Sequence, residues 1–129
     1  MLWYSDQIVH VEQIPSRESR ISNIDPPLPQ RLNDSLKEQG VYSFYVHQEQ
    51  ALSACRVGEN IAVSTSAASG KSLCYNLPVL ESLLKDPTSR ALYLFPTKAL
   101  AQDQLRSLRS IIPKNSRINA DVFDGDTPF

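Results

Sequence analysis

A run of small residues ending in a lysine and a serine is the part of this sequence best suited to chemistry. The segment STSAASGKS covers residues 64–72 and ends in Lys71 and Ser72. Small residues let a backbone approach a phosphate closely. The lysine supplies a positive charge for the β- and γ-phosphates, and the serine hydroxyl can bind Mg²⁺. The segment therefore predicts a triphosphate-binding loop, whose residues are Thr65, Ser66, Ala67, Ala68, Ser69, Gly70, Lys71 and Ser72, with Ser72 as the metal ligand.

The residues on either side predict the setting that such a loop needs. Residues 60–63 (NIAV) predict a short strand, and the segment from Leu73 onward (LCYNLPVLESLLK) predicts an amphipathic helix whose leucines pack on the sheet. A helix N-terminus offers free N–H groups and the positive end of the helix dipole. Thr65 stands where the P-loop pattern has its first glycine, and a solvated turn can carry GKS by chance. The flanking strand and helix favour the nucleotide site.

Gln48 is a second candidate, at the start of a helix predicted over residues 46–57 and ended by Gly58. A glutamine amide can pair with both N6 and N7 of adenine. Phe44 or Tyr45 could offer a stacking face to the base. The alternative interpretation is that Gln48 is an ordinary helix-surface amide and that the aromatic residues belong to the core.

The rest of the chain predicts alternating helices and strands. Leucines four apart at 28, 32 and 36 predict a helix from about residue 29, ended by Gly40. The segment RALYLF predicts a parallel strand covered on both faces. Thr97 is placed to cap the helix that follows. The remaining predictions are a strand at 7–13, a proline-rich arm at 15–29 and a strand at 119–123.

Composition excludes several functional classes. The 129 residues are 41% hydrophobic, which is enough for a modest core, and the net charge is −1 with a pI of about 6.1. Bulk charge therefore predicts neither a nucleic-acid nor a membrane partner, so any such binding depends on local groups. The first residues lack the pattern of a secretion signal, and no apolar run is long enough to span a bilayer. Cys55 and Cys74 are expected to be reduced core residues, which favours the cytoplasm.

Taken in order, these segments resemble the first part of a superfamily 2 helicase of the DEAD/DEAH type. The resemblance is to the RecQ-related branch that includes bacterial mitomycin repair factor A and its fungal relatives. It extends over nearly the whole chain, through the segments QIVHVEQIPSRES, PLPQRLNDSLKEQGVYSFYVHQEQAL, TSAASGKSLCYNLPVL, FPTKALAQDQL and FDGDTP. Several motifs in one order are more specific than the loop alone.

The resemblance implies an α/β fold, the first part of a RecA-like P-loop NTPase domain over residues 41–129, preceded by an arm and helix over residues 1–40. It implies that Gln48 reads adenine and that the loop binds ATP with Mg²⁺. It also implies two contacts with the backbone of single-stranded or partly duplex DNA, RNA not being excluded. These contacts would be made by Pro96, Thr97 and Lys98 (motif Ia) and by Gly125, Asp126 and Thr127. The parent activity would be ATP-driven movement along DNA in repair.

The acidic motif and the second RecA-like domain of such helicases have no counterpart in these residues. We therefore expect no catalytic residue here and negligible ATPase from this chain alone. Since RecA-like sheets interleave strands that are distant in sequence, we also expect exposed strand edges and a tendency to aggregate.

Two other hypotheses stay open from the sequence. The chain could be a non-catalytic nucleotide-binding module, or a subunit of a split helicase that joins a separately encoded remainder. A small P-loop kinase or other phosphotransferase is disfavoured, because PTKAL and DGDTP have no role in one.

Overall fold

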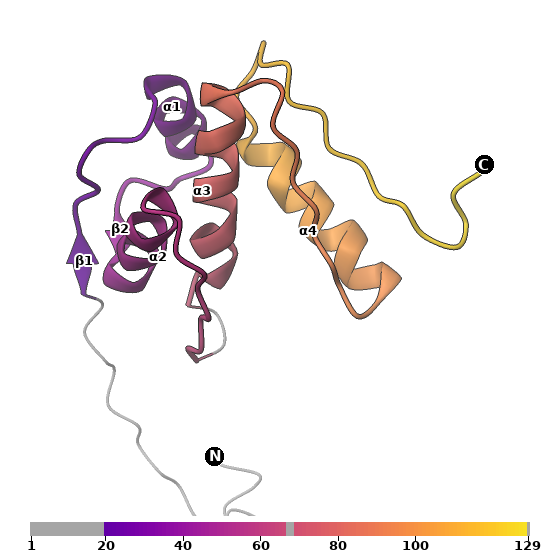
Figure 1. The fold of residues 1–129 in the computed structure, drawn as a ribbon, viewed down its shortest axis with the longest axis horizontal. Helices are drawn as coiled ribbons and strands as arrows, with labels where there is room; N and C mark the ends of the chain where they lie inside the picture. The colour runs from indigo at the N-terminus through magenta and orange to yellow at the C-terminus, as the bar shows by residue number, and fades with distance from the viewer. Residues whose placement is uncertain (1–19, 67–68, 129) are drawn as a thin grey trace, which may run out of the picture.

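The computed structural model describes residues 20–66 and 69–128 and is shown in Figure 1. The predicted strand at 7–13, Ala67 and Ala68 lie outside the described residues. In chain order the elements are β1 (Ile21–Ser22), α1 (Gln30–Glu38), β2 (Phe44–Tyr45), α2 (Val46–Arg56), α3 (Lys71–Lys85) and α4 (Lys98–Ile111). None of the helices in these described ranges is long and apolar enough to cross a membrane.

The helices begin and end where the predicted signals stand. After α1, Gly40 has φ +81° and donates its N–H to the Lys37 carbonyl at 2.9 Å. Gly58 follows α2 in the same left-handed conformation, with φ +82°. At the start of α4, the Thr97 hydroxyl accepts a hydrogen bond from the Leu100 N–H at 3.2 Å. Both glycine stops and the threonine cap are therefore confirmed.

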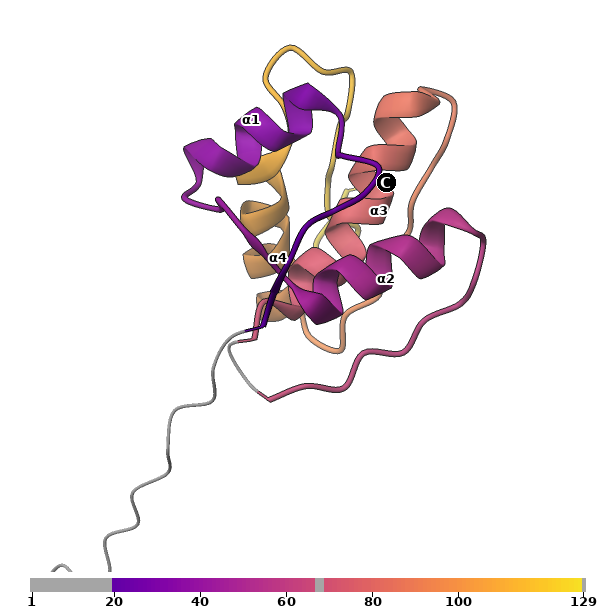
Figure 2. The same cartoon turned by 90° about the vertical axis from the view of Figure 1, so that its left-hand side faces the viewer.

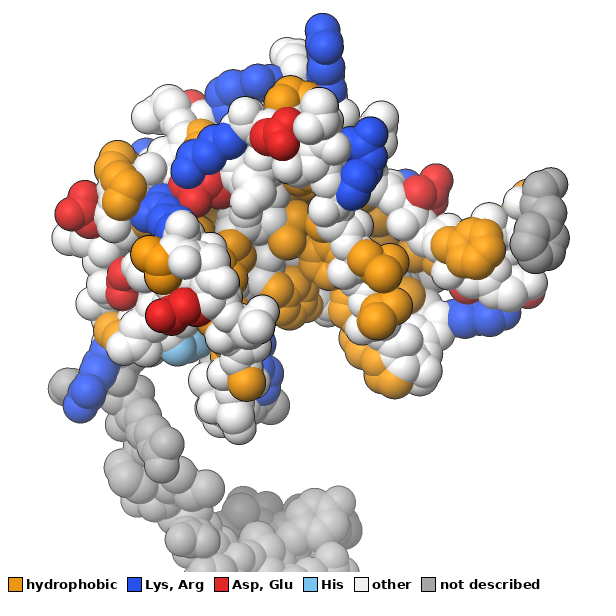
Figure 3. Space-filling view, in the orientation of Figure 1, with side chains coloured by type: hydrophobic (Ala, Val, Ile, Leu, Met, Phe, Trp, Pro, Cys, Tyr) orange, Lys and Arg blue, Asp and Glu red, His pale blue; other side chains and the backbone are white. Residues whose placement is uncertain are grey.

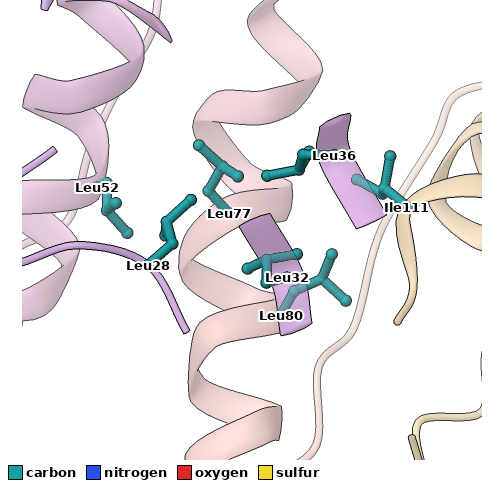
Figure 4. Close-up of a cluster of buried hydrophobic side chains, with 7 residues drawn as sticks. All are labelled: Leu28, Leu32, Leu36, Leu52, Leu77, Leu80 and Ile111. Carbon is teal, nitrogen blue, oxygen red and sulfur yellow. The ribbon is translucent and has the colours of Figure 1, made fainter. Parts of the chain in front are cut away.

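The core is built from helices. Figures 2 and 4 show α3 lying against α1 and α2, with leucines of all three helices meeting between them. Leu77 and Leu80 of α3 are fully buried in this cluster, and Leu73 and Leu84 are packed against it. The prediction that the α3 leucines pack on a sheet is therefore wrong, because leucines of α1 and α2 cover that stripe. The buried cluster comprises Leu28, Leu32, Leu36, Leu52, Leu77, Leu80 and Ile111.

A bidentate ion pair joins α2 to α3 beside this core. Arg56 donates from Nε to Glu81 Oε2 at 2.9 Å and from Nη2 to Oε1 at 2.7 Å. The side chain of Glu81 is only 5% exposed, and Lys85 lies 3.5 Å from its Oε2. The hydrogen bonds from Arg56 hold the pKa of Glu81 below its ordinary value. This pair fixes the relative position of the two helices that flank the predicted loop.

The described residues form one small sheet. β1 and β2 pair antiparallel, with Ile21 opposite Tyr45 and Ser22 opposite Phe44. The Val46 N–H continues this pairing to the Arg20 carbonyl at 3.0 Å. The sheet therefore attaches residues 20–22 to the start of α2.

Within residues 20–66 and 69–128, the segments at 60–63, 90–95 and 119–123 are not strands of a sheet, so these three strand predictions are wrong. Figure 1 draws these segments without arrows. The second one keeps the alternation of a strand: Tyr93 and Phe95 are half-buried, while Leu92 and Leu94 are 85% and 84% exposed. An apolar run of strand length becomes a strand only when it pairs with a second extended backbone, and the sheet of the described residues consists of β1 and β2.

Candidate nucleotide and nucleic-acid site

Gly70 and the first turn of α3 form the centre of the predicted loop. Gly70 precedes the helix in the left-handed conformation, with φ +70°, and Lys71 and Ser72 are the first two helical residues. A Cβ added at Gly70 would lie 2.5 Å from Nε2 of Gln48. A glycine is therefore needed here for its backbone conformation and for the close approach of α2. As the first residues of α3, Lys71 and Ser72 have N–H groups without an acceptor inside the helix, as an anion site requires.

Lys71 lies folded over its own loop. Its ammonium donates to the carbonyl oxygens of Thr65 at 2.8 Å and Ser66 at 3.2 Å. The hydroxyls of Thr65 and Ser69 are hydrogen-bonded to each other across the loop. Both contacts close the loop around the position of the ammonium. A phosphate entering the loop would compete with these carbonyls for the same positive charge.

A cavity of about 590 Å³ opens at this end of α3. Its polar wall is the loop and the start of α3, and its apolar wall includes Ile61 and Val63 from the segment before the loop. Figure 3 shows apolar side chains exposed on the face between α3 and α4. This volume falls in the range of small-molecule sites. The lining residues are Ile61, Val63, Ser69, Gly70, Lys71, Ser72, Cys74, Tyr75 and Gln104.

Gln48 is not a surface amide, because only 2% of the residue is exposed. Its Oε1 accepts the Tyr45 N–H at 2.9 Å, and its Nε2 donates to the Gly70 carbonyl at 3.0 Å. One amide N–H and one lone pair remain for other partners. The helix-surface interpretation is therefore wrong, and adenine recognition by Gln48 stays a prediction. Phe44 packs against the core, whereas Tyr45 is 38% exposed.

The two segments predicted to contact nucleic acid meet in space. Lys98 donates to Asp126 Oδ2 at 2.7 Å, although 28 residues separate them. Thr127 and Asp124 bind each other twice, through the Asp124 N–H to the Thr127 hydroxyl at 2.9 Å and the Thr127 N–H to the Asp124 carbonyl at 3.1 Å. This turn presents Gly125 to the side chain of Lys98. Pro96, Thr97 and Lys98 are all exposed.

Among the described residues, no group of three His, Cys, Asp or Glu side chains comes together as a metal site. Ser72 lines the cavity with a hydroxyl oxygen, which is a hard donor of the kind that Mg²⁺ prefers. Mg²⁺ commonly takes only one or two protein oxygens and completes its shell with phosphate oxygens and water. The single hydroxyl therefore fits a metal that arrives together with a triphosphate.

Three residues of this site were missed from the sequence. His47 bonds to the loop carbonyl of Ser69 at 2.7 Å, and the Tyr75 hydroxyl donates to Gln104 Oε1 at 2.8 Å beside the cavity. The only sequence signal for His47 is that it directly precedes Gln48. Tyr75 and Gln104 are 29 residues apart, and no spacing rule connects them.

The chain is similar to known helicases over most of its length. A family model described as DEAD/DEAH box helicase matches residues 45–128. The uncharacterized ATP-dependent helicase YprA of Bacillus subtilis is 43% identical over 124 residues, which are 95% of this chain and 17% of YprA. The ATP-dependent helicase HRQ1 of Saccharomyces cerevisiae is 41% identical over 128 residues, 97% of this chain and 12% of HRQ1. The chain thus spans less than a fifth of the length of these relatives.

Solved structures of the DUF1998 helicase MrfA are also similar. The structure bound to DNA and AMPPNP superposes with a TM-score of 0.84 at 45% identity and covers 89% of this chain and 16% of MrfA. The structure bound to DNA alone gives a TM-score of 0.83 at 44% identity with the same coverage.

Proposed function

Because the chain belongs to the DEAD/DEAH box helicase family, we propose that it forms the ATP-binding N-terminal portion of an ATP-dependent DNA helicase. The family predicted from the sequence is confirmed, and so is the fold class, an incomplete RecA-like domain. The observation that carries the proposal is the geometry at the start of α3: a left-handed Gly70, then Lys71 and Ser72 as the first helical residues, beside a cavity of about 590 Å³.

In the proposed complex each loop residue has a distinct task. The N–H groups at the start of α3 bind phosphate oxygens, and Lys71 exchanges its two loop carbonyls for the β- and γ-phosphates. Ser72 would hold Mg²⁺ through its hydroxyl, and the ion would supply positive charge that offsets the charge of the triphosphate. Thr65, Ser66 and Ser69 line the loop, Ala67 and Ala68 lie outside the described residues, and Gln48 reads adenine with its remaining N–H and lone pair.

The proposed nucleic-acid contacts are made by residues 96–98 and 125–127. Their meeting through Lys98 and Asp126 supports one continuous contact with a sugar-phosphate backbone. Hydroxyls and backbone N–H groups can make such contacts, so a chain with a net charge of −1 can still bind DNA. DNA is favoured as the partner because the similar MrfA structures are described as DNA-bound. The single-stranded or partly duplex form would be the substrate, in DNA repair.

In the same proposal, hydrolysis and strand movement belong to the full-length parent, and this chain alone has negligible ATPase. Residues 1–40 form the arm and helix before the RecA-like part, which occupies residues 41–129. The parent acts in the cytoplasm, which is supported by the free thiols of Cys55 and Cys74.

Titration calorimetry with ATP and Mg²⁺ tests this proposal. The unmodified chain should bind, and Lys71→Ala should weaken binding at least tenfold, since it removes a charge from the phosphate site. Lys37→Ala on α1 makes the same charge change away from the loop and should leave the affinity unchanged. A well-folded chain that ignores millimolar ATP, or equal affinity in Lys71→Ala, would contradict nucleotide binding. Lys71-dependent phosphate release in the presence of single-stranded DNA would contradict the expected lack of turnover.

A further inference from the structure

Two consecutive residues at the start of α2 hold two consecutive carbonyls of the phosphate loop. Nε2 of His47 lies 2.7 Å from the Ser69 carbonyl, and Nε2 of Gln48 lies 3.0 Å from the Gly70 carbonyl. Both contacts span 22 residues of sequence. They connect the helix that carries the proposed base-reading residue to the loop that carries the proposed phosphate-binding residues.

The chemistry of the Ser69 carbonyl settles the direction of the His47 contact. A carbonyl oxygen can only accept, so Nε2 of His47 carries the proton and donates it. The imidazole is held in this orientation by the ring of Tyr45, which stacks on it with centroids 5.5 Å apart and planes inclined by 14°. The carbonyl of His47 faces α3, where the Cys74 thiol lies 3.9 Å from it. His47 thus stacks on Tyr45 through its ring and contacts α3 through its backbone.

Holding these carbonyls also orients the next N–H groups. In a trans peptide the C=O and the following N–H point in opposite directions. When the Ser69 and Gly70 carbonyls are held by α2, the N–H groups of Gly70 and Lys71 point away from α2. These groups belong to the end of α3 that offers free donors to an anion.

We propose that His47 is a positioning residue for the nucleoside triphosphate, acting through its Nε2–H bond to the Ser69 carbonyl. It fixes the phosphate loop and does not touch the nucleotide. Gln48 stabilises the adjacent carbonyl, but it is also the proposed base contact, so His47 is the residue that separates loop positioning from base recognition. The inference rests on the proposed ATP-binding function. The contact between His47 and the loop can also be tested in the absence of nucleotide.

Two substitutions of His47 test its hydrogen-bond donor and its aromatic ring separately. His47→Phe keeps a ring that can stack on Tyr45 and loses the N–H, whereas His47→Gln keeps an N–H donor of similar reach and loses the ring. Loss of one hydrogen bond predicts that His47→Phe binds both Mg²⁺–ATP and inorganic triphosphate about three- to tenfold more weakly. His47→Gln should stay within about twofold of the unmodified chain. The control Ser53→Ala removes a hydrogen bond within α2, from Ser53 to Glu49 at 2.6 Å, and should change neither affinity.

A readout without nucleotide uses nuclear magnetic resonance on the ligand-free chain. The imidazole ¹⁵N shifts of His47 should show the Nε2-protonated form at neutral pH. ¹⁵N relaxation of the Gly70 and Lys71 amides should show more loop motion in His47→Phe than in His47→Gln or Ser53→Ala. If the unmodified chain binds no ATP, the proposed function fails while this readout still decides the loop contact. A neutral His47 protonated at Nδ1 alone, or His47→Phe with unchanged loop motion and triphosphate affinity, would overturn the inference.

Discussion

At the scale of single residues, Gly70 shows how one position can have two separate requirements. Its φ of +70° disfavours any side chain, and Nε2 of Gln48 occupies the space where a Cβ would stand. Gly58 has a similar φ of +82°, but a Cβ there would meet no atom within 4 Å. Gly58 is therefore a matched control for Gly70, because the two glycines share a left-handed backbone and differ in the contact with Gln48.

Gly70→Ala and Gly58→Ala should both lower the free energy of unfolding by about 1–2 kcal/mol, because both force alanine into the left-handed region. Only Gly70→Ala should also weaken ATP binding, since its Cβ displaces the Gln48 amide from the loop. Urea denaturation and calorimetry on both variants measure the two effects. Equal ATP affinities in the two variants would show that the Gln48 contact does not matter for the loop.

The buried ion pair between Arg56 and Glu81 belongs to the same scale. Glu81→Gln leaves the guanidinium without its charged partner and should cost about 3 kcal/mol of stability at pH 7. Asp103→Asn removes the partner of Arg106 in an exposed pair on α4 and should cost almost nothing. Urea denaturation of the three proteins at pH 7 measures this difference.

The ion pair between Arg56 and Glu81 should also make the free energy of unfolding depend on pH. The folded pKa of Glu81 is lowered, so its stabilisation is complete above the unfolded value of about 4.3 and is lost as pH falls through the folded value. The stability difference between the unmodified chain and Glu81→Gln should therefore shrink below about pH 4. Asp86, whose pKa is also lowered, contributes equally to both proteins and cancels. A difference that stays constant down to pH 2 would exclude Glu81 as its source.

At the scale of elements, local signals were sufficient for the helices and insufficient for the strands. Gly40, Gly58 and Thr97 act through their own backbone or a neighbouring N–H, so their effects could be predicted from sequence. The apolar run at residues 90–95 has no local partner, and its pairing depends on a backbone elsewhere. The contact between His47 and Ser69 has the same origin, because packing of α2 against α3 brings the two residues together.

The cap of α4 gives a prediction at this scale. Thr97→Ala removes the acceptor of the Leu100 N–H and should lower stability by about 1 kcal/mol. Thr97→Ser keeps the hydroxyl oxygen and should retain most of that stability. Thermal unfolding of both variants measures the effect. Identical midpoints for alanine and serine would mean that the cap contributes nothing.

At the scale of the whole molecule, the segment at residues 91–95 contacts α3 through Tyr93, and its outer side is open. Tyr93 faces inward and donates to Asn76 Oδ1 at 3.0 Å, and burial raises its pKa to about 12. Leu92 and Leu94 face outward. Contiguous exposed apolar side chains beside unpaired backbone favour self-association.

A double substitution, Leu92→Lys with Leu94→Lys, should reduce self-association without lowering stability, since both side chains are more than 80% exposed. Leu80→Ala, in the fully buried cluster, should instead lower stability by about 2–5 kcal/mol. Analytical ultracentrifugation and urea denaturation separate the two effects. Undiminished self-association of the lysine variant would mean that Leu92 and Leu94 do not form the surface through which the chains associate.

The order of the core along the chain has a consequence for synthesis. Among the described residues, six of the seven members of the buried cluster, from Leu28 to Leu80, precede residue 81, and the seventh is Ile111. On the ribosome, the three-helix nucleus and the loop it supports can form while the apolar segment at 91–95 is still inside the exit tunnel. This segment then emerges onto a surface that is already built, so that Tyr93 can bond to Asn76 as soon as it leaves the tunnel.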